Sequence, residues 1–355
     1  MGESDQAQNT RTREFRGPRR WKKGWKAMRQ LEVALIGAGL IARFHLQEWV
    51  DAGVAVRIHS NDGRAAELAS EFGARAVGSL AEALNGVDAV DICTPTSTHR
   101  EIALAAIGKG VDVVCEKPLA ATAAEAEEIV DAAEQTGVRL YPAHYVRFAP
   151  AFARLHDLVA SGRMGEGAVA RFCFSAYHPR PWTGPMSAQS GGILTDQMLH
   201  GVDIAYWIFG EVVRVYACYQ GEIAAPAPEG TVATGTAVLT HANGAISQVV
   251  SRWTATPHPP VRVAFHVSGT GGTVSHDSRW PQQVRVADGL AGDFGYGGTS
   301  VFAAEMREFA AAFAGGPEPR LGARDALAAV RLTQAAAESA RTGRAVELPV
   351  KGAAA

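Results

Sequence analysis

The sequence is short of several features that would assign it to a special class. It has only four cysteines among 355 residues, with no C-x-x-C spacing, which argues against a disulfide scaffold or a clustered zinc site. No apolar run approaches the length that a membrane span requires. The formal net charge is only −2, so the bulk charge does not favour a nucleic-acid partner. With 47% hydrophobic and 20% charged residues, the chain resembles an ordinary globular protein long enough for two cores.

One stretch, residues 1–30, departs from this balance. It holds nine Lys and Arg residues against three acids, a charge of +6 that leaves −8 for the remainder. Arg19 and Arg20 resemble the start of a twin-arginine export signal, but lysines follow where an apolar region is required. We therefore expect a basic, flexible tail, with contact to nucleic acid or an anionic surface as the alternative. Cys93 and Cys115 stand in apolar runs and predict reduced core residues of a cytoplasmic protein without a membrane partner.

The stretch from Leu31 to Trp49 predicts a strand, a glycine turn and a helix. A short apolar run, typical of a strand buried on both faces, leads directly into the turn. Gly37 permits a tight turn, and Gly39 would let the main chain approach a pyrophosphate at the helix N-terminus. Apolar residues and His45 then recur at helical spacing. This context predicts a dinucleotide site.

The end of the second strand, expected at 54–58, should choose between NAD and NADP. An acid at this position would hold the ribose 2′-hydroxyl of NAD. The chain instead offers Ser60 and Asn61, with Arg64 one turn into the next helix. Hydroxyl, amide and guanidinium groups suit a 2′-phosphate better than a diol. Because the acidic Asp62 comes two residues late, we favour NADP over NAD only slightly.

The order of elements predicts an α/β protein with two domains. Strands and helices alternate over 31–148, the signature of a Rossmann domain with a parallel sheet. Over 149–355, long and partly alternating strands predict an α+β domain for substrate and oligomerisation, with an open, mostly antiparallel sheet. A helix over 192–209 interrupts these strands. We expect the last helix, 323–341, to be able to pack back on the Rossmann domain, and 281–298 to be a surface loop.

The candidate catalytic side chains stand at two places beside the expected cofactor cleft. Lys117 follows the fifth strand, and Asp196 and His200 are spaced i, i+4 on one helix, so that their side chains share a face. Hydride transfer between C–OH and a nicotinamide needs a base for the hydroxyl proton and a cation on the oxygen. His200 suits the first task and Lys117 the second, with Asp196 orienting substrate and His200. The turn over 94–96 ends a central strand, where ligands bind in doubly wound sheets.

Two further interpretations concern histidines and aromatic residues outside this set. A metal site with His178 or His144 as additional ligand is disfavoured, because no H-x-x-x-H or H-E-x-x-H spacing appears, and we predict no metal. Tyr177, His178 and Trp182 precede the catalytic helix and suit stacking on a sugar ring. The alternative is a structured loop or a subunit contact.

Five motifs together resemble the Gfo/Idh/MocA oxidoreductase family, named for glucose-fructose oxidoreductase and inositol dehydrogenase. Four match as they stand and the last is close: GAGLIARFH (37–45), CTPTSTH (93–99), CEKPLA (115–120), GGILTDQMLHGVD (191–203) and HYVRFAP (144–150). The resemblance implies a Rossmann domain followed by an α/β domain with an open sheet. It also implies an NAD(P)-dependent oxidoreductase that acts on a secondary hydroxyl or ketone of a sugar, cyclitol or related polyol.

The resemblance extends to the site residues. It implies that Lys117 lies near the nicotinamide, often before a cis proline, here Pro118, and that Asp196 and His200 complete the substrate site. Tyr145 stands where the family commonly has Asn. The expected cofactor-binding residues are Gly37, Gly39, Leu40, Ile41, Ser60, Asn61, Arg64, Thr94, Pro95, Thr96, His99, Glu116 and Lys117. The expected substrate-binding residues are Tyr145, Arg147, Tyr177, His178 and Trp182.

Three alternatives to a freely exchanging polyol dehydrogenase stay open at this point. The nucleotide could be tightly held in glycoside processing, or the substrate could be a dihydrodiol or an imine. An alternative of another class is a non-catalytic sensor that binds a dinucleotide, although a sensor needs neither Lys117 nor His200. The exposed face of the open sheet needs to be covered by another surface. We therefore expect a homodimer or homotetramer.

Overall fold

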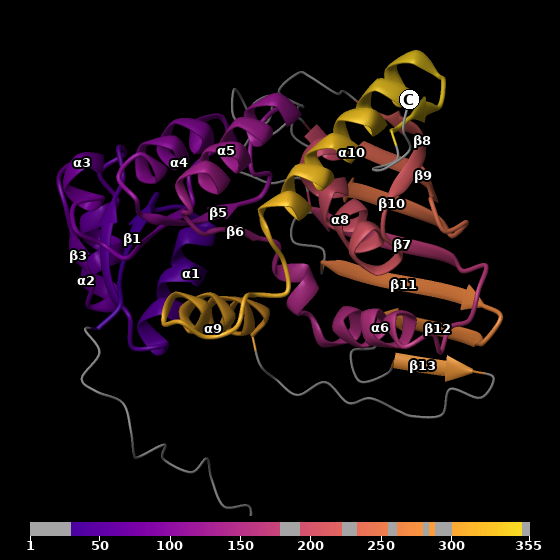
Figure 1. Cartoon of the computed structure of the whole chain (residues 1–355), viewed down its shortest axis with the longest axis horizontal. Coiled ribbons are helices and arrows are strands. Elements are labelled where there is room, and N and C mark those ends of the chain that lie inside the picture. The colour runs from indigo at the N-terminus through magenta and orange to yellow at the C-terminus, as the bar shows by residue number, and fades with distance from the viewer. Residues whose placement is uncertain are drawn as a thin grey trace, which may run out of the picture. The chain divides into compact units, whose positions relative to one another are not determined.

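The computed structural model describes residues 30–177, 192–221, 233–254, 261–279, 284–287 and 300–349. The part from Leu31 onward is one compact unit built on two sheets (Figure 1). The basic tail expected over 1–30 lies outside the described residues except for its last position. No helix among the described residues combines the length and the apolar character needed to cross a bilayer.

The first sheet has six strands, all parallel, in the order β3-β2-β1-β4-β5-β6. This confirms the predicted Rossmann-type architecture. The strands are β1 (Glu32–Ile36), β2 (Ala55–His59), β3 (Arg75–Ala76), β4 (Ala89–Ile92), β5 (Asp112–Glu116) and β6 (Leu140–Ala143). The connecting helices are α1 (Leu40–Asp51), α2 (Ala65–Phe72), α3 (Leu80–Ala83), α4 (His99–Ile107) and α5 (Ala123–Thr136), with short 3₁₀ turns η1 (Thr96–Thr98) and η2 (Tyr145–Phe148).

Helices cover both faces of this sheet, as its apolar strands require. The cluster on one face joins α1 and α2 to α9 (Val301–Phe313), with Trp49 and Phe309 fully buried in it. The cluster on the other face joins α4 and α5 to the first half of α10 (Ala323–Thr342) through Leu327 and Val330. The strand order reverses between β1 and β4, so the loops that follow these two strands flank the crevice where such sheets bind ligands.

The second sheet has eight strands in the order β13-β12-β11-β7-β10-β9-β8-β14. Every pair is antiparallel except β7 with β10, so the predicted mostly antiparallel sheet is confirmed. The prediction of a loop over 281–298 is wrong at β13, which extends the sheet edge. The strands are β7 (Val169–Tyr177), β8 (Val212–Gln220), β9 (Ala233–His241), β10 (Ile246–Thr254), β11 (Arg262–Gly269), β12 (Gly272–Asp277), β13 (Val284–Ala287) and β14 (Val346–Glu347).

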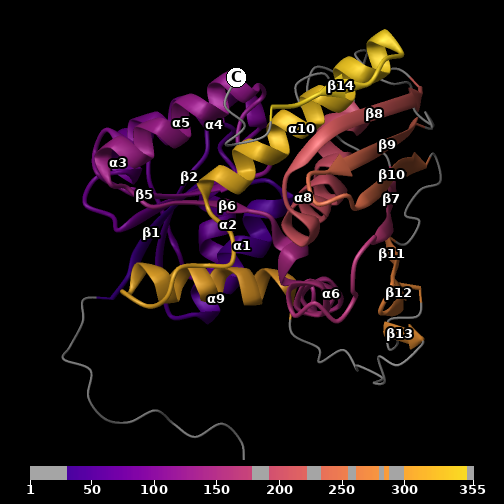
Figure 2. The same cartoon turned by 45° about the vertical axis from the view of Figure 1, so that its right-hand side comes forward.

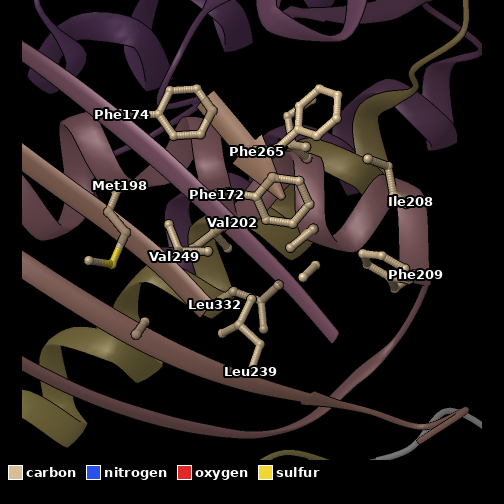
Figure 3. Close-up of a cluster of buried hydrophobic side chains, with 14 of the residues drawn as sticks. Phe172, Phe174, Met198, Val202, Ile208, Phe209, Leu239, Val249, Phe265 and Leu332 are labelled. Atoms are coloured by element: carbon tan, nitrogen blue, oxygen red, sulfur yellow. The ribbon is translucent and has the colours of Figure 1, made fainter. Parts of the chain in front are cut away.

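One face of the second sheet carries α6 (Pro150–Ala160), α8 (Met198–Phe209) and the second half of α10. Figure 2 shows α10 crossing from the helices of the first sheet to the second sheet. In the core between α8 and the sheet, Phe172, Phe174 and Val249 face α8 (Figure 3). A Cβ on Gly201 would lie 2.4 Å from Val249 Cγ1, so only glycine lets α8 pack this closely. This packing fixes the position of the neighbouring His200.

Candidate active site

The glycine turn after β1 has the shape that a dinucleotide requires. Gly37 has φ +109°, and a Cβ there would lie 2.5 Å from the carbonyl oxygen of Cys93, so the β1 and β4 loops meet only because this residue is glycine. Gly39 is the N-cap of α1, where a Cβ would meet no atom within 4 Å and no side chain caps the helix. The open N-terminus of α1 therefore fits the pyrophosphate of a dinucleotide. Leu40, 56% exposed, and the half-buried Ile41 border this opening.

The loops after β4 and β5 are tied together beside this turn. Thr94, Pro95 and Thr96 lie half-buried at the end of β4. The buried ring of His99 places its two nitrogens 2.9 Å from the carbonyl oxygens of Thr94 and Pro118, and burial lowers its pKa. The peptide bond between Lys117 and Pro118 is cis. His99 thus supports the walls of the expected nicotinamide region from behind.

An ion pair between Asp62 and Arg64 lies just after the end of β2. The carboxylate of Asp62 accepts a hydrogen bond from Arg64 Nε at 2.7 Å and another from the Ser60 hydroxyl. These bonds hold the pKa of Asp62 well below its usual range. The amide oxygen Oδ1 of the exposed Asn61 accepts a hydrogen bond from His59 Nε2 at 3.0 Å. Asp62 therefore partly neutralises the charge of Arg64. From the sequence alone this acid has little weight, because it comes two residues late.

Lys117 joins the first sheet to the segment that precedes α8. Its ammonium donates to Asp196 Oδ1 at 2.5 Å and approaches the Asp196 carbonyl oxygen at 3.5 Å. Both side chains are mostly buried. Burial acts to lower the pKa of Lys117, but the carboxylates of Asp196 and Glu116 outweigh it, so the pKa is raised and the ammonium stays charged.

Asp196 does not pair with His200 as the i, i+4 spacing suggests. The helix expected over 192–209 begins with a π-helical turn, η3 (Ile193–Gln197), and only then continues as α8. This wider turn carries Asp196, whose carboxylate contacts Lys117, and no hydrogen bond joins these two described side chains, Asp196 and His200. π-Turns of this kind occur often at functional sites.

His200 is a buried, neutral imidazole, 6% exposed. Its ring lies 5.1 Å from the Tyr145 ring and 6.1 Å from that of Phe174, measured between centroids. Burial, followed by the positive charge of Lys117 and the neighbouring ring of His144, holds the pKa of His200 well below its usual value. An uncharged imidazole at neutral pH is competent to accept a proton.

The structure separates the two candidates that follow β6. Tyr145 lies half-buried with its ring against His200, and burial raises its pKa to about 12 although Lys117 opposes this shift. Arg147 is 0% exposed, and its guanidinium donates to Asp203 at 2.6 and 2.9 Å and to Asp325 at 3.1 Å. It therefore ties η2 to α8 and α10. Of the remaining substrate candidates, the backbone of Tyr177 ends β7, whereas His178 and Trp182 lie outside the described residues.

Comparisons with known proteins agree with this geometry. A family model described as "Oxidoreductase family, NAD-binding Rossmann fold" matches residues 31–144, and the "GFO/IDH/MocA C-terminal domain" matches 152–275. The chain belongs to the Gfo/Idh/MocA oxidoreductase family. It is similar to D-apiose dehydrogenase of Paraburkholderia graminis, with 29% identity over 90% of each chain. Inositol 2-dehydrogenase of Rhizobium meliloti is 27% identical over 90% of this chain and 99% of its own.

A solved structure supports the same assignment. GenD2 from gentamicin A biosynthesis, in complex with NAD, superposes with a TM-score of 0.77 and 28% identity, covering 93% of this chain and 99% of that one. The resemblance to the Gfo/Idh/MocA family stated from the motifs is thereby confirmed, as is the prediction that the chain is a nicotinamide-dependent oxidoreductase.

The motifs of the Gfo/Idh/MocA family did not reveal a polar cluster beneath the site. His45 and Asp91, each 0% exposed, lie there at 3.0 Å from one another, and Glu116 lies 3.3 Å from His45. Glu305 of α9 is buried near enough for their charges to act on it. Two signals could have indicated it. His45 stands on the apolar stripe of its helix, and Asp91 interrupts an apolar strand; polar residues on buried faces need buried partners.

The same cluster is where the described residues could best hold a metal ion. Ligand atoms of His45, Asp91 and Cys93 all lie within 4.8 Å of one another. Burial and the neighbouring Asp91 raise the pKa of the Cys93 thiol, which disfavours the thiolate that a metal would require.

Proposed function

We propose that this member of the family oxidises a secondary hydroxyl, or reduces the corresponding ketone, on a sugar, cyclitol or related polyol. Bound NAD(P) supplies the hydride acceptor or donor. His200 accepts the hydroxyl proton in oxidation and returns it in reduction, because its imidazole is neutral. The Lys117 ammonium stabilises negative charge on the substrate oxygen. Asp196 orients Lys117 and contacts a further substrate hydroxyl.

The observation that carries this proposal is the meeting of Lys117, Asp196 and His200. A cation fixed by a carboxylate stands near a neutral imidazole, at the same sheet edge as the open glycine turn. This is the combination that hydride transfer from C–OH needs. The names of the similar proteins, with D-apiose and inositol as substrates, favour a polyol.

The experiment that tests the function combines binding with turnover. Purified protein, shown to be free of retained nucleotide, is titrated with NADH and NADPH by fluorescence, then assayed with D-apiose, myo-inositol and other polyols. We expect micromolar binding and reduction of cofactor with at least one polyol. Binding without turnover, together with unchanged biological function in Lys117→Ala, would instead identify the sensor. Nucleotide that stays bound through purification would instead support the alternative of a tightly held cofactor in glycoside processing.

For the cofactor, we propose that the Asp62–Arg64 pair sets the choice between NAD and NADP. A 2′-phosphate must displace the Asp62 carboxylate to reach Arg64, which offsets the preference for NADP that the residue types suggest. We expect the affinities of the wild-type protein for NADPH and NADH to differ by less than about tenfold. Asp62→Asn should shift the ratio toward NADPH, and Arg64→Ala should shift it toward NADH. If both variants keep the wild-type ratio of NADPH to NADH affinity, the residues that follow β2 do not select the cofactor.

For the substrate, we propose that Tyr145 lines the site and that Arg147 has a structural role instead of the expected substrate contact. The ring of Tyr145 lies against His200, whereas the Arg147 guanidinium contacts Asp203, Asp325 and the Trp207 ring, all of which belong to the helices around it. Tyr177, His178 and Trp182 stay proposals for stacking on the polyol. We keep the domain division at 31–148 and 149–355.

We further propose that the protein is cytoplasmic and assembles as a homodimer or homotetramer through the open face of the second sheet. All four cysteines are free, as a reducing compartment favours. Exposed apolar side chains pair across neighbouring strands, Tyr216 with Val238 and Ile246 with Val169. A second copy would cover them. Light scattering should show an oligomer that Tyr216→Glu weakens and the exposed α5 control Gln135→Glu does not; a monomeric wild type would contradict this.

A further inference from the structure

A set of buried ionisable side chains lies directly behind Lys117. His45 comes from α1, Asp91 from β4, Glu116 from the end of β5 and Glu305 from α9, and none is more than 6% exposed. Such groups are costly to bury unless they neutralise one another. The proposed reaction uses none of them directly, so their presence needs a separate explanation.

The two nitrogens of His45 face two different carboxylates. Nδ1 lies 3.0 Å from Asp91 Oδ2, and Nε2 lies 3.3 Å from Glu116 Oε1. A neutral imidazole has one N–H and one acceptor nitrogen, whereas an imidazolium offers an N–H to each side. Nδ1 is hydrogen-bonded to Asp91, whereas Nε2 has Glu116 at ion-pair distance without an aligned hydrogen bond. A carboxylate on each side of the ring favours the charged imidazolium.

The other neighbours of His45 are consistent with this charge. Asp91 Oδ2 also accepts a hydrogen bond from the Trp49 indole at 2.7 Å, and the Cys93 sulfur lies 3.4 Å from Nδ1. Burial acts to lower the pKa of His45, but the charge of the Asp91 carboxylate and the hydrogen bonds to Asp91 and the Cys93 sulfur raise it well above its ordinary value. Burial, reinforced by the nearby carboxylates, raises the pKa of Glu305, so this third acid is neutral.

Glu116 connects the cluster to the reacting groups. Its Oε2 accepts a hydrogen bond from the backbone N–H of Lys117 at 2.9 Å, at the residue whose ammonium binds Asp196. The same carboxylate contributes to the raised pKa of Lys117. Displacing Glu116 would thus both release the Lys117 main chain and remove negative potential from its ammonium.

We propose that Asp91, His45 and Glu116 form a buried carboxylate–imidazolium–carboxylate triad that positions Lys117 and supports its charge. His45 and Asp91 act through Glu116, and none of the three needs to touch substrate, so they are positioning residues. This inference rests on the proposed role of Lys117. A metal ion held by His45, Asp91 and Cys93 is the competing explanation, and it would require Nδ1 to be without a proton.

The direct test reads the proton count of His45 without any need for turnover. Long-range ¹H–¹⁵N spectra of protein labelled at histidine report whether each ring carries one proton or two, and the spectrum of His45→Gln assigns the signal. We expect both nitrogens of His45 to be protonated at pH 8, far above the usual titration of histidine. A neutral ring at pH 8, or stoichiometric metal by elemental analysis, would overturn the proposal.

The second test reads the effect on Lys117. In Glu116→Gln, the alkaline limb of the pH profile of kcat, measured at saturating cofactor, should move down by about one pH unit. Asp196, Tyr145 and His200 also face Lys117 and are unchanged in this variant. His45→Gln should shift the limb in the same direction, and if it does not fold, Glu116→Gln alone decides. An unmoved limb in Glu116→Gln would overturn the proposal.

The matched control is His241→Gln. His241 is also a buried histidine with two hydrogen bonds, to the Gly210 carbonyl at 2.9 Å and the Ser247 hydroxyl at 2.8 Å, but it lies in the second sheet. Its substitution should leave the pH profile unchanged. If wild-type protein shows no turnover with any polyol, the proposed function fails while the spectra still decide the state of His45.

Discussion

Two buried histidines of this molecule, His200 and His45, have opposite protonation states. His200 packs against Phe174 and Tyr145 with Lys117 nearby, and its pKa lies well below the ordinary value. His45 is equally inaccessible but stands between carboxylates, and its pKa lies well above that value. Burial acts to lower both pKa values, so the charge of the neighbours decides between them.

The difference assigns the two rings to different tasks. A neutral ring beside the proposed substrate site can exchange a proton, whereas a ring that is charged at neutral pH and lies behind that site holds its neighbours in place. Lys117 lies between them and is charged because of acids from both sides, Asp196 in front and Glu116 behind. Changing one neighbour at a time should therefore move one ring and spare the other.

The largest effect is expected for Lys117→Met. Loss of the cation should lower kcat/KM about 10³-fold, because the proposed reaction relies on this ammonium to stabilise charge on the substrate oxygen. It should also raise the pKa of His200 part of the way toward its ordinary value, since burial remains. Kinetics and histidine NMR measure the two effects. Lys109→Met, at an exposed position of the same domain, is the control, and a His200 pKa that does not rise would show that burial alone lowers it.

His200→Gln should lower kcat about 10²-fold. The base must be neutral, so its lowered pKa lets polyol oxidation continue below pH 6.5 and fall only at more acidic pH. Lys117, His144 and Asp203 face this ring and stay in place in the variant. The acid limb of the rate profile should therefore disappear. If the acid limb persists unchanged in His200→Gln, it reports the titration of another group.

The sequence was sufficient for the parts of this comparison that follow a regular period. The apolar strands, the glycine turn and the position of Lys117 at a strand end were all predictable, with element ends within one or two residues. Asp196 was not, because i, i+4 spacing assumes an α-helix and the chain forms a π-turn there. The acids around His45 come from β4, β5 and α9, and only the folded chain brings such distant segments together.

Asp91→Asn should destabilise the buried surroundings of His45 and leave those of His200 unchanged. The amide keeps one acceptor for the Trp49 indole but removes the charge beside the buried ring, which should cost about 2 kcal/mol of unfolding free energy. The pKa of His200 should stay where it is. Urea unfolding and histidine NMR measure these outcomes. A shift of His200 as large as that of His45 would mean that the two regions are not independent.

The smallest effect is the pH dependence of stability that His45 contributes. Its pKa is raised in the folded state, so the stabilisation is fully present below about pH 6.5, the unfolded value, and is lost as pH rises toward the folded value. One proton corresponds to at most about 1.4 kcal/mol per pH unit, and Asp91, Cys93, Glu116 and Glu305 face the ring and share the titration. The difference in unfolding free energy between wild type and His45→Gln should therefore be larger at pH 6 than at pH 9. A difference that grows with pH would place His45 in the neutral class of His200.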